Sequence, residues 1–62
     1  MSVHDEIECI GNTAKNEIIL AWFDYLDLKI SEKSMVQKFH VETGHVESID
    51  SIEWYVRQWR GY

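Results

Sequence analysis

Three histidines and one cysteine are the side chains of this 62-residue chain that could bind a metal ion together. His4 and Cys9 are five positions apart, and so are His40 and His45. Three imidazoles and one thiol match the number and kinds of ligand in a tetrahedral zinc site. Structural zinc sites, however, usually contain a closely spaced pair of cysteines, which is missing here. The sequence therefore favours solvated histidines with Cys9 as a small buried residue, and it predicts no metal site and no cofactor.

Acid–base or nucleophilic catalysis has weaker support. Asp24 and Asp27 are three positions apart and would share a helix face, but other acidic residues surround them, which is typical of a solvated surface. Cys9 with His40 lacks a recognisable third group that would orient the pair. A chain of this length also scarcely encloses a pocket, so we expect a protein that is not an enzyme.

The C-terminal twelve residues are the strongest candidate for a binding element. They contain two of the three tryptophans, two of the three tyrosines and both arginines. These residue types most often supply the binding energy of protein interfaces, because large, rigid, amphipathic groups gain contact area at little entropic cost. The partner-binding residues predicted in this segment are Trp54, Arg57, Gln58, Arg60 and Tyr62, and Asp24 and Asp27 join them as the acidic part of the interface.

The charge is unevenly distributed along the chain. Residues 1–50 contain four lysines and ten acidic residues, whereas residues 51–62 contain two arginines and one glutamate, within a net charge of −5. Because an acidic chain is repelled by phosphate backbones, a protein partner with a basic surface is the better electrostatic match. Nucleic-acid binding through the aromatic and arginine residues of the C-terminal segment is the alternative.

Length and composition indicate one small domain that occupies residues 1–62. At this size a fold buries only about 60% of the surface that its unfolded chain would expose, so a second copy could supply additional burial as a homodimer. A single cysteine allows no internal disulfide, which favours a reducing cytoplasm. The sequence shows neither a signal peptide nor an apolar run of about 20 residues that would span a membrane.

The first half of the chain predicts an extended arm followed by a helix. Residues 1–12 form the arm, in which apolar and polar residues alternate in part. Residues 13–30 form the main helix, since apolar residues recur there with helical periodicity. The alternation of Leu26, Leu28 and Ile30 is a competing strand pattern at the end of this helix.

The second half predicts two shorter helices. Ser31 is a suitable N-cap for residues 31–44, and Gly44 suits the left-handed position after the helix. For residues 50–60, Asp50 and Glu53 resemble a capping box, with Ile49 and Trp54 as a hydrophobic staple. The apolar stripe of this last helix comprises Ile52, Tyr55, Val56 and Trp59, and Trp54 points nearly opposite to it.

These patterns together predict an all-α fold, a small three-helix domain with an extended N-terminal arm. The alternative is an α+β fold in which the arm and residues 36–49 pair as a short sheet beside two helices. The expected function is that of a small acidic, non-catalytic protein that binds a macromolecule, most readily a protein, and modulates or inhibits it.

Overall fold

The computed structural model describes the backbone of residues 3–60 and the side chains of residues 6–60. Over this range the chain forms four helices: α1 (Val3–Glu8), α2 (Asn12–Leu26), α3 (Glu32–Thr43) and α4 (Ile49–Arg60). The predicted all-α class is therefore confirmed. The alternative with a sheet is wrong for residues 3–60, where the backbone forms no strand.

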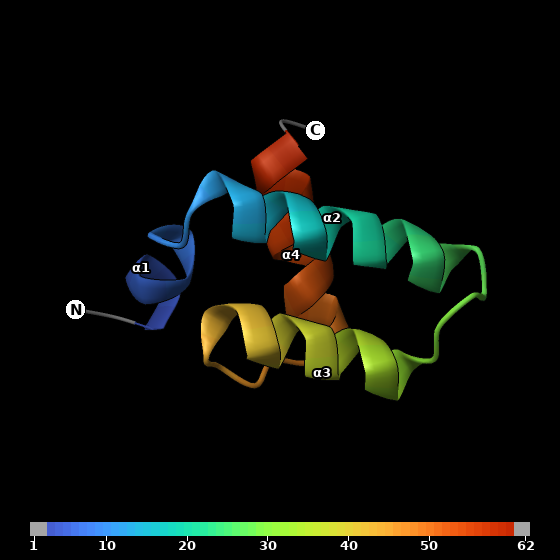
Figure 1. The fold of residues 1–62 in the computed structure, drawn as a ribbon. Helices are drawn as coiled ribbons and strands as arrows, with labels where there is room; N and C mark the ends of the chain where they lie inside the picture. Colours follow the sequence, from blue (N-terminus) through green and yellow to red (C-terminus); the bar gives the residue numbers. More distant parts are fainter. Residues whose placement is uncertain (1–2, 61–62) are drawn as a thin grey trace.

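The three longer helices pack against one another in pairs. Figure 1 shows α2 and α3 running in opposite directions along one side of the molecule, while α4 crosses both of them and α1 closes one end. Because α4 crosses α2 instead of running along it, α4 can cover only part of the apolar surface of α2.

The core lies where these helices meet. Its completely buried side chains come from all four helices, and they are Ile7, Ile18, Met35, Phe39 and Ile52. The ring centroid of Phe39 lies 5.7 Å from that of Tyr55 and 6.4 Å from that of Trp59. Burial raises the pKa of the Tyr55 phenol, and the nearby carboxylates of Glu47 and Glu8 raise it further. The predicted stripe of the last helix is confirmed for Ile52, Tyr55 and Val56, and Trp59 packs partly buried against the same core.

Helix α1 differs from the extended arm predicted for residues 1–12. The helix from Val3 to Glu8 buries Ile7 completely in the core. An extended arm that buried the same side chain would form fewer local hydrogen bonds. A contact of 3.0 Å between Glu6 Oε2 and His45 Nε2, which is an ion pair when the imidazole is protonated, links α1 to the segment that follows α3. These tertiary contacts stabilise a helix that is too short to persist alone.

Helix α2 ends at Leu26, four residues before the predicted end at Ile30. The backbone N–H of Lys29 donates to the carbonyl of Asp24, and that of Leu28 donates to the carbonyl of Tyr25. This pair of hydrogen bonds is the Schellman motif, which requires a left-handed residue after the helix. Leu28 occupies that position with a φ of 63°, so the usual glycine signal for the end of a helix was absent from the sequence.

Leu28→Gly is expected to stabilise the domain by about 0.5–1 kcal/mol, because a left-handed conformation strains an L-residue with a side chain but not glycine. The leucine side chain is 91% exposed, so little burial is lost with it. The expected rise in melting temperature is a few degrees for a domain of this size. Leu26→Gly is the control, since a glycine inside the last turn of α2 should instead destabilise by about 1 kcal/mol. If Leu28→Gly instead lowers the melting temperature, Leu28 is not strained in its left-handed conformation.

Both predicted ends of α3 are confirmed. The Ser31 hydroxyl accepts a hydrogen bond of 3.1 Å from the backbone N–H of Ser34, and Gly44 adopts the left-handed conformation with a φ of 79°. The hydroxyl of Thr43 donates to the carbonyl of Phe39 over 2.8 Å and accepts from the N–H of His45 over 3.1 Å. The chain therefore turns at the end of a helix here, and the alternative in which residues 36–49 belong to a sheet is wrong.

Helix α4 begins one residue earlier than predicted and with a different cap. The Ser48 hydroxyl, not Asp50, accepts from the backbone N–H of the third residue along, Ser51, over 3.3 Å. The capping box of Asp50 with Glu53 is therefore wrong. The staple of Ile49 with Trp54 is wrong for the same reason, since both residues lie inside the helix.

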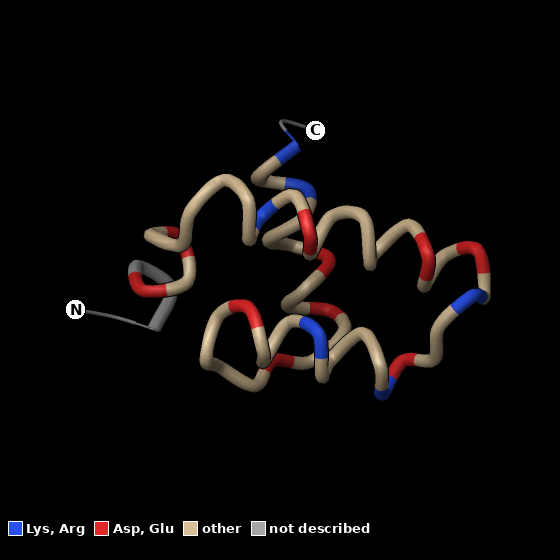
Figure 2. Tube along the Cα trace, viewed as in Figure 1, with Lys and Arg blue, Asp and Glu red and all other residues tan. Residues whose placement is uncertain are grey.

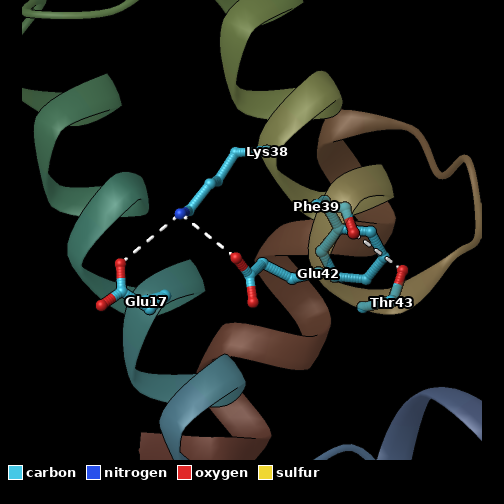
Figure 3. Close-up of polar contacts among 5 residues, drawn as sticks. All are labelled: Glu17, Lys38, Phe39, Glu42 and Thr43. Atoms are coloured by element: carbon cyan, nitrogen blue, oxygen red, sulfur yellow. Dashed lines mark hydrogen bonds and ion pairs between the residues drawn. The ribbon is translucent and has the colours of Figure 1, made fainter.

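A lysine links α2 to α3 on the outer surface (Figure 3). Lys38 Nζ lies 3.3 Å from a carboxylate oxygen of Glu42 and 3.4 Å from one of Glu17. The hydrogen bond to Glu42 is the main cause of a raised pKa of Lys38, against the opposing effect of partial burial, and Glu17 adds to it. Since this pKa is raised in the folded state, the contact stabilises the fold at neutral pH and is lost only in strong alkali.

None of the helices within residues 3–60 is long and apolar enough to cross a membrane.

Candidate binding surface

A groove of about 280 Å³ lies between α2 and α4. The groove follows from helical periodicity, because on each helix the residue that faces the core is followed by residues whose side chains reach the edge of the groove. Trp22 and Val56 form the buried floor. The residues that line the groove are Trp22, Phe23 and Leu26 of α2 and Glu53, Val56, Arg57 and Arg60 of α4.

Two apolar side chains of the groove remain accessible to solvent. Phe23 is 39% exposed and Leu26 is 56% exposed. Both belong to a broad arc of apolar residues on the main helix, with Ile18, Ile19, Trp22 and Tyr25, and the sequence did not select either as a binding residue. That arc was broader than one crossing helix can cover, and its breadth was the signal that part of it would stay uncovered.

Two arginines line the same groove. The guanidinium carbon of Arg60 lies 4.3 Å from the ring centroid of Phe23, and elsewhere between the two helices Lys15 Nζ lies 5.7 Å from the ring centroid of Trp59. Arg57 Nη2 is 3.8 Å from a carboxylate oxygen of Glu53. Figure 2 shows basic segments near the place where the C-terminal half of α4 passes α2, further basic segments on α3 and on the connection that precedes it, and acidic segments spread over the molecule. The tertiary structure thus brings the two arginines that the sequence placed together against the apolar side chains of α2.

Trp54 lies on the outer side of α4 with its side chain 45% exposed, in the direction predicted from the sequence. Its ring lies nearly perpendicular to that of Tyr55 at a centroid distance of 5.1 Å, and both residues line a second hollow of about 220 Å³. Residues three and four positions apart are neighbours on a helix surface, so Arg57 and Gln58 adjoin Trp54. Through Arg57, Trp54 is continuous with the groove.

The remaining predicted binding residues lie elsewhere. Asp24 is half-buried and lines a separate hollow between α2 and α3, together with Leu20 and Lys38. Asp27 is exposed at the C-cap of α2. The structure therefore does not unite these carboxylates with the arginines, and Tyr62 lies outside the described residues.

The candidate zinc ligands are not assembled in the described part of the chain. His40 is exposed on α3, and His45 pairs with Glu6. Cys9 is exposed, which contradicts its expected burial. The side chain of His4 lies outside the described residues. Among the side chains of residues 6–60, no three of the His, Cys, Asp and Glu type are grouped so that they could hold a metal ion.

Comparison with protein-family models, with curated proteins and with solved structures finds no match to this chain. Inference about function therefore rests on the geometry of the surface. We use the name α2–α4 face for the groove together with Trp54 and Gln58, which adjoin it along α4. Its members are Phe23, Leu26, Trp54, Arg57, Gln58 and Arg60.

Proposed function

We propose that this chain is a non-catalytic domain that binds another protein through the α2–α4 face and thereby modulates or inhibits it. One observation carries the proposal: exposed Phe23 and Leu26 line the groove together with Arg57 and Arg60, and exposed Trp54 adjoins Arg57 on α4. Tryptophan and arginine are the residue types most enriched among those that dominate binding energy. An exposed apolar patch with a polar border is typical of an interaction site.

The shape of the face supports a macromolecular partner over a small molecule. Pockets that enclose small ligands usually have volumes of about 300–1,000 Å³ and bury most of the ligand. The groove between α2 and α4 is smaller, at about 280 Å³. Such a surface can receive side chains that project from another protein.

The overall charge supports a protein over a nucleic acid. Ten acidic residues against four lysines over residues 1–50 repel a phosphate backbone and attract a basic protein surface. Trp54, Arg57 and Arg60 could nevertheless stack on bases and pair with phosphates. Nucleic-acid binding through α4 is therefore the alternative that an experiment must separate.

A photo-crosslinking experiment on two matched glutamines tests the proposal. Gln58 belongs to the α2–α4 face, whereas Gln37 is exposed on α3. Each is replaced in turn by benzoylphenylalanine, the protein is irradiated in a lysate of its source cell, and the adducts are treated with nuclease. We expect Gln58, but not Gln37, to yield a discrete protein adduct that resists nuclease.

An adduct that disappears with nuclease would replace the proposal by its nucleic-acid alternative. Equal adducts from both positions, or none from Gln58, would show that the α2–α4 face is not a protein-binding surface. The far-ultraviolet circular dichroism of both variants should match that of the parent, so that a lost adduct cannot be attributed to unfolding.

A further inference from the structure

The chemistry of the groove identifies the kind of partner segment that it fits. We infer that the groove between α2 and α4 receives a segment of the partner protein in which large apolar side chains are flanked by carboxylates. This inference rests on the proposed function, and it adds that the partner is locally acidic at the groove even though this chain is acidic overall.

The apolar part of the inference follows from the lining. Trp22 and Val56 are buried beneath the groove, and Phe23 and Leu26 leave apolar surface exposed along its side. Water on this surface is displaced favourably only by another apolar group. The volume of about 280 Å³ accommodates side chains, so the apolar groups belong to a protein segment.

The acidic part follows from the charges around the groove. Arg57 and Arg60 line the groove, and Glu53 is the carboxylate that lines it with them. The pair of Arg57 with Glu53, at 3.8 Å, joins two well-exposed side chains, and such surface pairs contribute little. A partner carboxylate can therefore exchange for Glu53 and form the bidentate contact that arginine favours.

The acidic remainder of the chain does not cancel this local field. At physiological ionic strength, charges separated by more than about 8 Å are largely screened from each other. The nearest charges therefore decide what binds in the groove, while the net charge acts on the approach of the partner. A nucleic acid would supply anions without the apolar side chains that the groove also requires.

Three labelled peptides test the inference. All share one amphipathic helical sequence with leucine and phenylalanine on one face, and they differ only in whether the flanking positions are Glu, Gln or Lys. We expect fluorescence anisotropy to show that the Glu peptide binds roughly tenfold more tightly than the Gln peptide and that the Lys peptide binds most weakly. Added salt should reduce the difference between Glu and Gln.

Two double variants, each of which removes two positive charges, test whether the preference for the Glu peptide arises in the groove. Arg57→Gln with Arg60→Gln should remove the preference for the Glu peptide, whereas Lys29→Gln with Lys33→Gln should retain it. Lys29 and Lys33 are exposed and lie outside the groove. Matching circular dichroism and melting temperature of both double variants would establish that each remains folded.

Several outcomes would overturn the inference. They are equal affinity for the three peptides, loss of preference in the lysine variants as well, tighter binding of a single-stranded oligothymidylate than of the Glu peptide, and sedimentation that shows a stable dimer closing the groove. If crosslinking from Gln58 still captures a protein, any of these outcomes leaves the proposed function intact and rejects only the acidic, apolar occupant. If that crosslink is also absent, the proposed function fails with it.

Discussion

Phe39→Ala is expected to unfold the domain. Phe39 is completely buried and lies between the helices, with the rings of Tyr55 and Trp59 beside it. Replacing a buried phenylalanine by alanine costs about 3–5 kcal/mol, which includes the cavity that remains. A domain of this length has a total stability of only about 3–9 kcal/mol at 0.05–0.15 kcal/mol per residue. Thermal melting followed by circular dichroism should show a lost or strongly shifted transition.

Phe23→Ala is the matched control, because the chain contains only these two phenylalanines. Phe23 is 39% exposed at the edge of the groove, so its removal should lower the free energy of unfolding much less. A Phe39→Ala variant as stable as the Phe23→Ala variant would show that the helices do not pack around Phe39.

Trp54→Ala is expected to weaken partner binding about tenfold or more while the protein stays folded. Loss of a central tryptophan from an interface typically costs about 2 kcal/mol or more. Within the domain, in contrast, Trp54 is 45% exposed and lies outside the buried stripe of α4. The yield of the protein adduct from benzoylphenylalanine at position 58 measures binding, and thermal melting measures stability.

Val41→Ala provides the comparison for this prediction. Val41 is also an exposed apolar residue, at 66%, but it lies on α3 away from the α2–α4 face. Its replacement should leave both the adduct yield and the melting temperature nearly unchanged. If Trp54→Ala instead abolishes folding, its contact with Tyr55 is structural and the interface excludes Trp54.

The crossing of α4 over α2 connects stability with the proposed binding. Where the two helices touch, Trp22 and Val56 are buried in the core. Where they diverge, Phe23, Leu26 and the arginines remain at the surface and line the groove. One packing geometry therefore produces both the buried core and the exposed apolar edge of so small a domain.

Local signals were enough to predict the class of the fold and the limits of α3. Ser31 and Gly44 act within one turn of their own positions, so their roles can be read from neighbouring residues. The buried stripe of α4 could be predicted in the same way, since helical periodicity alone brings Ile52, Tyr55 and Val56 to one face. The cap of α4 was predicted at Asp50, but two capping patterns overlap in this segment. In the structure Ser48 accepts the capping hydrogen bond.

Contacts between distant residues decided the rest. Helix α1 forms where the burial of Ile7 and the pairing of Glu6 with His45 compensate for its shortness, and no neighbouring residue signals either contact. The end of α2 could not be predicted from a glycine either, because Leu28 occupies the left-handed position there.

The sequence by itself determined which residue types the binding surface could use, because Trp54, Arg57, Gln58 and Arg60 share one helix. Only the tertiary structure decided that Phe23 and Leu26 join them and that Asp24 and Asp27 do not. The physical reason is that periodicity fixes the direction of a side chain about its own helix axis, whereas the angle at which two helices cross decides which of those directions remain open to solvent.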